Sequence, residues 1–319
     1  MFRWVGLTMA AALLVVLVAA CDEEENTSGA GGPVALGPGV WVTDKSAHKI
    51  VKFGFGGAKW GEVGDFGWPV DVAVREADGT VWVADTGAAE VVKVRVDGLV
   101  IKRLEDFNAP EAVAVNQNDG SCWMADVDAG NVYRVDAAGN VKVNVGGFNS
   151  PYDVDCYGTD GSAWVADTYN HRVVKLNADG TQALVVSLPN LMPMAVAVDP
   201  RNGDVWVGCA QKLLKLSGGT VVKDISGVYN VWNIALDPRD GSLALADEKA
   251  VRKFDADGNK VWEDTDYDLS YGVAVNKNTG AVWATDLLNP RLVEYSSVGN
   301  KQLEVTAGLV EPLDVALTY

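Results

Sequence analysis

The chain repeats one phrase of about 40 residues seven times, and this repetition restricts the fold more than any other feature. The clearest part of each copy is a tryptophan followed three residues later by an aspartate. The copies are Trp41-Val-Thr-Asp44, Trp82-Val-Ala-Asp85, Trp123-Met-Ala-Asp126, Trp164-Val-Ala-Asp167 and Trp283-Ala-Thr-Asp286, with Trp206-Val-Gly-Cys209 and Ala244-Leu-Ala-Asp247 as degenerate members. A period near 40 residues, without a helical 3.6-residue pattern, is typical of the blades of a β-propeller.

Each copy contains four strand-like segments. The first strand usually follows a proline, as in Pro69–Val74 and Pro110–Val115, and its fifth position is a column of alanines that only Asp155 interrupts. A turn with glycine leads to the tryptophan strand, and glycine tolerates the backbone conformation that tight hairpins need. The third strand ends in a column of basic residues, and a second glycine turn opens a weaker outer strand. Each copy therefore predicts a four-stranded antiparallel sheet.

The two ends of the repeat region are out of phase with each other. It begins at the tryptophan strand near Val40 and ends on a lone first strand, Pro312–Tyr319. If these two fragments share one sheet, six complete copies and one composite copy make seven blades. Joining the ends pairs two strands that would otherwise be exposed edges. We predict one all-β domain, residues 40–319, that forms a seven-bladed propeller closed by its terminal strands.

The first twenty residues differ from the repeats. Arg3 precedes an apolar run that is short for a membrane span, and this is typical of a signal peptide, residues 1–20. The run ends in Val18-Ala19-Ala20-Cys21, which resembles a bacterial lipoprotein cleavage box and implies lipidation of Cys21. The following stretch, residues 21–39, is acidic and then rich in glycine and proline, as expected of a tether. We expect a protein anchored to a membrane of the cell envelope, either periplasmic or surface-facing.

The net charge is −17, and the chain has no basic stretch. Proteins that bind nucleic acids neutralise phosphates with lysine and arginine, so we expect no nucleic-acid partner. Acidic side chains spread over an exported domain favour solubility, and we expect a monomer.

One copy carries a more specific phrase. The segment from Trp164 to Leu176 contains Asn170-His171-Arg172, and the whole region beyond Gly39 resembles NHL-repeat propellers and the related YncE-like and streptogramin-lyase-like groups. These groups include binding scaffolds, lyases and lactonases, so the resemblance implies a fold and leaves several functions open.

The repeated aspartate and tryptophan columns favour structural roles. An aspartate at the end of the tryptophan strand can accept hydrogen bonds from backbone N–H groups, and a catalytic residue is needed only once. The tryptophan rings are expected to pack between neighbouring sheets.

Few residues are available for other chemistry. His48 and His171 are the only histidines, and His171 and Asp155 are the weak catalytic candidates. An exported protein can form disulfides, and Cys122 and Cys156 are expected at the same level of the ring, either bonded to each other or as two buried thiols.

A polar set lies at the start of the first strands, next to Tyr152, Trp232 and Tyr271. Its members are Asp71, Glu111, Asp153, Asn233 and Asp314. Their oxygens could hold Ca²⁺ or Mg²⁺, since both ions prefer such ligands, and some lactonase-type propellers resemble this arrangement. The alternative is the polar, water-filled lining of a channel mouth.

Variable residues between the aspartate column and the third strand are expected on the same face. They are 86–90, 127–131, 168–171 and 287–290. Variation on a regular scaffold suits a recognition surface. The leading hypothesis is therefore a binding or scaffold module for an envelope protein, peptide or glycan. The alternative is a divalent-metal-dependent lyase or lactonase with its site at the channel mouth.

Overall fold

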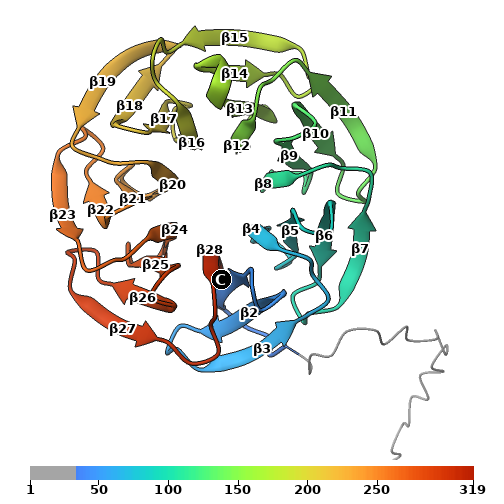
Figure 1. Cartoon of the computed structure of the whole chain (residues 1–319), viewed down its shortest axis with the longest axis vertical. Helices are drawn as coiled ribbons and strands as arrows, with labels where there is room; N and C mark the ends of the chain where they lie inside the picture. The colour runs from blue at the N-terminus through green and yellow to red at the C-terminus, as the bar shows by residue number, and fades with distance from the viewer. Residues whose placement is uncertain (1–33) are drawn as a thin grey trace, which may run out of the picture.

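The computed structural model describes residues 34–319, which form a ring of seven four-stranded antiparallel sheets (Figure 1). The predicted fold class is confirmed. The predicted signal peptide, the lipidation site Cys21 and most of the predicted tether lie outside the described residues. In the part of the chain from residue 34 onward, no helix is long and apolar enough to cross a membrane.

The four strands of each blade follow one another from the centre of the ring outward. The first four blades are β28 (Pro312–Thr318), β1 (Gly39–Asp44), β2 (Lys49–Gly54) and β3 (Lys59–Val63); β4 (Pro69–Val74), β5 (Val81–Asp85), β6 (Glu90–Val94) and β7 (Val100–Leu104); β8 (Pro110–Val115), β9 (Cys122–Asp126), β10 (Asn131–Val135) and β11 (Val141–Gly146); β12 (Pro151–Tyr157), β13 (Ser162–Asp167), β14 (Arg172–Leu176) and β15 (Gln182–Ser187). The last three are β16 (Pro193–Val198), β17 (Val205–Cys209), β18 (Lys212–Ser217) and β19 (Thr220–Ser226); β20 (Val231–Leu236), β21 (Leu243–Asp247), β22 (Ala250–Phe254) and β23 (Lys260–Asp264); β24 (Ser270–Val275), β25 (Val282–Asp286), β26 (Arg291–Tyr295) and β27 (Lys301–Val305). A short 3₁₀ turn, Thr168–Asn170, joins β13 to β14.

The terminal strands close the ring as the sequence predicts. β28 pairs antiparallel with β1, with Val42 opposite Val315 and Gly39 opposite Thr318. The Gly39 N–H also donates to Thr318 Oγ1 at 3.0 Å. The C-terminal strand is therefore the innermost strand of the first blade, near the centre of the ring (Figure 1).

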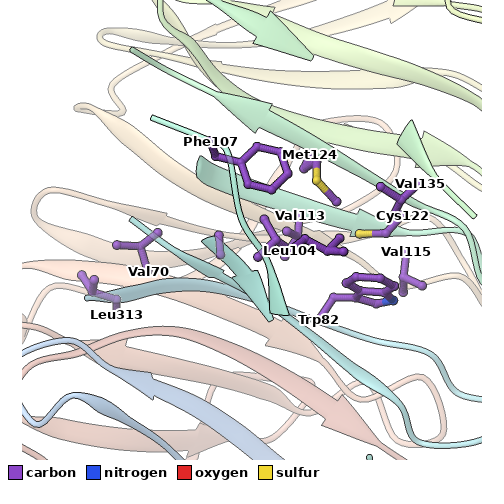
Figure 2. Packing of buried hydrophobic residues seen from close by; sticks show 12 residues of the cluster. Val70, Trp82, Leu104, Phe107, Val113, Val115, Cys122, Met124, Val135 and Leu313 are labelled. Atoms are coloured by element: carbon purple, nitrogen blue, oxygen red, sulfur yellow. The ribbon is translucent and has the colours of Figure 1, made fainter. Parts of the chain in front are cut away.

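The hydrophobic core lies between neighbouring blades. Trp82 of β5 is fully buried and belongs to one cluster with Val115, Cys122 and Met124 of the next blade (Figure 2). The other tryptophans of the column take the same place: Trp41, Trp123, Trp206 and Trp283 have no exposed surface, and Trp164 is 4% exposed. The predicted packing of this column between sheets is confirmed.

The basic column of the third strands also connects blades. Lys93 Nζ lies 5.1 Å from the centroid of the Trp82 ring and donates to the Ala137 carbonyl of the next blade at 2.5 Å. Lys215 repeats the arrangement over Trp206 and donates to the Ala256 carbonyl at 3.2 Å. These lysines hold their ammonium groups between an aromatic face and a carbonyl.

Each aspartate of the column ties its blade to the connection that enters it. The carboxylate of Asp85 accepts the N–H groups of Gly67 and Trp68 at 2.7 and 2.6 Å, just before β4 begins. Asp126 binds the N–H groups of Asn108 and Ala109 in the same way, both at 2.9 Å. The structural role predicted for this column is confirmed, and it reaches beyond the local turn.

The ring has two different faces. We call one the loop face; it carries the turns between second and third strands and the connections between blades. The other, the hairpin face, carries the remaining hairpins. Val34 is buried against the hairpin face, where its N–H donates to the Asp97 carbonyl in the β6–β7 hairpin at 3.2 Å. The packed chain thus begins a few residues before Val40.

Candidate functional site

The seven innermost strands surround a central cavity of about 610 Å³. It is lined mostly by valine and alanine residues of these strands. On the hairpin face it extends to Glu76, Gln117, Lys277 and Tyr319, which lie beyond or at the ends of the strands. A cavity of this size is large enough for a small ligand.

The structure brings the predicted polar set together. Asp71, Asp153, Asn233 and Asp314 line the central cavity, and the weak catalytic candidate Asp155 lines it as well. Glu111 joins the first four residues around a second cavity of only about 30 Å³, which has room for about one water molecule.

Three aromatic side chains narrow the channel at the loop face. The Trp232 and Tyr271 rings stack, with centroids 5.5 Å apart and planes 13° apart, and Tyr152 lies 6.3 Å from Trp232. The Tyr152 and Tyr271 hydroxyl oxygens are 3.4 Å apart. The sequence predicts the mouth of the polar channel on this face. The wide end is instead on the hairpin face, because the large side chains next to the polar set fill the other end.

The channel aspartates connect the innermost strands of adjacent blades. Each innermost strand is the edge of its sheet, so alternate N–H groups point into the channel without a strand partner. Asp153 accepts the N–H of Val154 at 2.8 Å and that of Val196 in the next blade at 2.7 Å. Asp155 does the same with Cys156 and Val198, at 2.8 and 2.7 Å.

A second pair completes this set of carboxyl bridges. Asp71 accepts the Val113 N–H at 2.6 Å, and Asp314 accepts the Val72 N–H at 3.2 Å. Asn233 donates to Asp314 Oδ1 at 3.0 Å from two blades away. Gly272 allows this approach, since a Cβ at that position would lie 2.9 Å from the same oxygen.

Burial raises the pKa of every carboxyl group in this set. It raises the pKa of Asp153 to about 8, that of Glu111 to about 7, and those of Asp155 and Asp314 to about 6. Burial and then the charge of Asp314 raise the pKa of Asp71 well above its usual value. Although the cavity leaves part of most of these side chains accessible, the surrounding strands disfavour the charged form.

The geometry does not favour a metal ion at these residues. Between residues 34 and 319, no group of three or more His, Cys, Asp or Glu side chains is arranged to hold one. Asp153 and Asp155 each use both carboxyl oxygens to accept backbone N–H groups. The polar set fits the alternative that the sequence left open, the polar lining of a channel, with the added role of joining blades.

The two histidines occupy equivalent turns on the loop face. His171 has a positive φ of 51°, and its Nδ1 lies 2.6 Å from the Leu191 carbonyl oxygen. His48 has a φ of 56°, and its Nδ1 contacts the Gly67 carbonyl oxygen. Both contact the connection to the next blade and lie outside the residues that line the central cavity. The structure thus gives His171 a structural partner.

The cysteines Cys122, Cys156 and Cys209 are free thiols. The disulfide considered between Cys122 and Cys156 is not formed. Burial raises the pKa of both thiols, which keeps them protonated and unreactive.

The loop face carries a second candidate site. Five of its large apolar side chains are well exposed, each by roughly half or more: Trp68 (51%), Tyr169 (55%), Tyr229 (46%), Leu288 (66%) and Val310 (55%). The sequence analysis places Tyr169 and Leu288 in the variable segments predicted to form a recognition surface. It does not predict the other three residues, which lie in connections between blades. The sequence contains one sign of these exposed residues. Trp68 is a large aromatic residue directly before the proline that begins a first strand, where other copies have Ala109 or Ser150.

The fold and these sites define a seven-bladed propeller with a closed ring, a central cavity that contains a polar set, and exposed aromatic residues on its loop face. Neither a protein-family model nor a curated protein matches the sequence. Among solved structures, a functionally unknown protein from Desulfotomaculum acetoxidans is similar, with a TM-score of 0.76 and 12% identity, over 89% of this chain and 99% of that chain.

Two lyases are also similar in structure. A streptogramin B lyase gives a TM-score of 0.65 at 16% identity, over 80% of this chain and 94% of that one. A virginiamycin B lyase from Staphylococcus aureus, solved with quinupristin, gives a TM-score of 0.66 at 15% identity, over 78% of this chain and 91% of that one. At such identities the similarity shows the propeller fold and not an activity.

Proposed function

We propose that this protein is a lipid-anchored binding module that holds a protein, peptide or glycan of the cell envelope on its loop face. The observation that supports this function is the exposure of Trp68, Tyr169, Tyr229, Leu288 and Val310 on that one face. Exposed aromatic side chains supply large contact areas at a low entropic cost, and they are enriched in recognition surfaces.

The position of Val34 supports a particular orientation. Val34 packs on the hairpin face, and the segment between it and Cys21 can extend over at most roughly 45 Å. The tether therefore joins the ring on the side opposite the loop face, and an anchor at Cys21 would leave the loop face free for a partner.

A pull-down from detergent-solubilised native membranes tests the proposal. We expect the wild-type protein to capture a partner and the variant Tyr169→Ala/Leu288→Ser to lose it. The matched control is Val222→Ser on the outer strand β19, where the valine is 50% exposed. Unchanged melting temperatures would show that all variants are folded. Equal capture by the loop-face variant and the wild type would contradict the proposal.

The second candidate function is a divalent-metal-dependent lyase or lactonase. The similar fold of the two lyases and the Glu111 carboxyl, whose pKa burial raises to about 7 beside Tyr152, favour it. Binding to the folded state alone raises stability. We expect millimolar Ca²⁺ or Mg²⁺ to leave the melting temperature unchanged relative to chelator, because the channel carboxyls already bind backbone groups. A metal-dependent rise that Asp153→Asn and Asp314→Asn remove would favour the enzyme instead.

A further inference from the structure

The central cavity is acidic at depth and carries a basic residue only at its mouth. Lys277, at the hairpin face, is the one lysine or arginine among the residues that line it in the chain from residue 34 to 319. Lys277 forms an ion pair with Glu76, and its Nζ lies 4.5 Å from the centroid of the Tyr319 ring. Its ammonium group is therefore engaged at the mouth, and the deeper carboxyl groups of Asp153 and Asp155 have no cationic partner among the residues around the cavity.

The carboxyl groups have already engaged the hydrogen-bond donors beside them. Asp153 accepts the N–H of Val196, and Asp155 accepts that of Val198, both at 2.7 Å. In an antiparallel sheet the N–H and C=O groups of one residue point to the same side of its strand. The carbonyl oxygens of Val196 and Val198 therefore also face the cavity, and they accept no hydrogen bond within the described chain. The groups left free in this part of the wall are oxygen acceptors.

The Asp155 carboxyl is fixed in place and still has capacity for a further donor. Its Oδ1 and Oδ2 each accept one N–H group, from Cys156 and Val198, whereas each carboxyl oxygen can accept two. Burial raises the pKa of Asp155 to about 6, so the carboxyl is mostly ionised at about pH 7.5. A metal ion would need several ligands around one point, but an ammonium group needs only oxygen acceptors within reach of its N–H donors.

We propose that the central cavity binds a small primary amine in its ammonium form, which enters from the hairpin face. The ammonium group donates to Asp155 and to the free carbonyl oxygens beside it, and the aliphatic body lies against the valine and alanine residues. A neutral alcohol gains less from the same acceptors, and a carboxylate is repelled by Asp155. A cavity of about 610 Å³ has room for such a ligand. This site is separate from the loop face, so the inference goes beyond the proposed binding function.

Isothermal titration of the full chain at about pH 7.5 with hexylamine, hexanol and hexanoate tests this inference, because the three ligands share one aliphatic body. Hexylamine should bind at least about tenfold more tightly than hexanol, since hydrogen bonds between charged groups are about twice as strong as neutral ones. Hexanoate should bind more weakly than hexanol. The variant Asp155→Asn should weaken the binding of hexylamine about tenfold and change that of hexanol by less than about twofold.

The control variant Asp257→Asn removes one exposed charge in the β22–β23 hairpin, outside the cavity. Its affinity for hexylamine should stay within about twofold of wild type, because distant exposed charges are screened. Equal weakening in both variants would overturn the inference, since it would show general attraction to a chain of net charge −17. In the wild type, the absence of hexylamine binding at millimolar concentration would overturn it, as would equal or tighter binding of hexanol or hexanoate. The pull-down tests the loop face, so either proposal can fail while the other stands.

Discussion

At the scale of single residues, aspartate has two distinct roles in this protein. The aspartates that end the second strands, such as Asp85 and Asp126, bind the connections that enter their own blades. The aspartates of the innermost strands, such as Asp153, bind N–H groups across to the next blade. The first group recurs in nearly every copy, whereas the second depends on which copies carry an acid facing the channel.

The channel aspartates predict how stability changes with pH. Burial, together with the charges of Asp71 and Asp155, raises the pKa of Asp153 to about 8, above the unfolded value of about 3.9. The folded state therefore binds more protons, and this contribution is complete below about pH 4 and is lost as the pH rises through about 8. We expect the melting temperature to fall between about pH 5 and 8, and Asp153→Asn to flatten that fall. Thermal unfolding of the wild type and of Asp153→Asn across this pH range measures the effect. If the melting temperature falls equally steeply in both proteins, Asp153 is not the group responsible.

Two tryptophans should contribute differently to stability, because one is buried and the other is exposed. Trp82 is fully buried between blades, and Trp68 is 51% exposed on the loop face. Trp82→Ala should lower the free energy of unfolding by about 3–5 kcal/mol, because it leaves a large cavity. Trp68→Ala should change it by no more than about 0.5 kcal/mol. Urea denaturation of both variants measures the difference. Similar losses would mean that Trp68 also supports the fold.

At the scale of strands and connections, repetition made the architecture predictable. Each strand, turn and column occurs several times, so the tryptophan packing, the aspartate bonds and the closure by Pro312–Thr318 followed from the sequence. The features that occur once did not follow. The direction in which the channel opens depends on the sizes of Tyr152, Trp232 and Tyr271, and the exposure of Tyr229 and Val310 depends on the path of single connections.

The connection before β4 offers a test of the aspartate column. Asp85→Ala would leave the N–H groups of Gly67 and Trp68 without their acceptor. The loss should be about 1–3 kcal/mol in the free energy of unfolding, and Asp85→Asn, which keeps one acceptor oxygen, should lose less. Hydrogen exchange at Gly67 and Trp68 should accelerate in the alanine variant and stay slow at Asn108, which Asp126 holds. Unchanged exchange at Gly67 and Trp68 would show that other contacts fix this connection.

At the scale of the whole molecule, the ring is continuous because β28 belongs to the same blade as β1. Three kinds of contact pass through this strand. Val315 and Leu317 pack into the core beside Trp283 of the last blade, the Leu313 carbonyl accepts the Thr285 hydroxyl of that blade, and Asp314 binds the Val72 N–H of the second blade. The strand thus links three blades, and its loss affects more than one sheet.

Deletion of residues 312–319 tests the closure directly. Without β28, β1 becomes an exposed inner edge, and the packing between the last blade and the first loses Val315 and Leu317. Exposed edges of this kind favour association. We expect the truncated protein to lose its single cooperative unfolding transition and to aggregate on heating, as measured by circular dichroism and light scattering. Tyr319→Phe is the control: it removes only the hydroxyl, which accepts the Lys277 N–H at 2.8 Å and donates to the Val275 carbonyl at 3.3 Å. It should cost about 1–2 kcal/mol and keep one transition. A truncated protein that unfolds cooperatively at the wild-type temperature would show that the ring does not depend on its terminal strand.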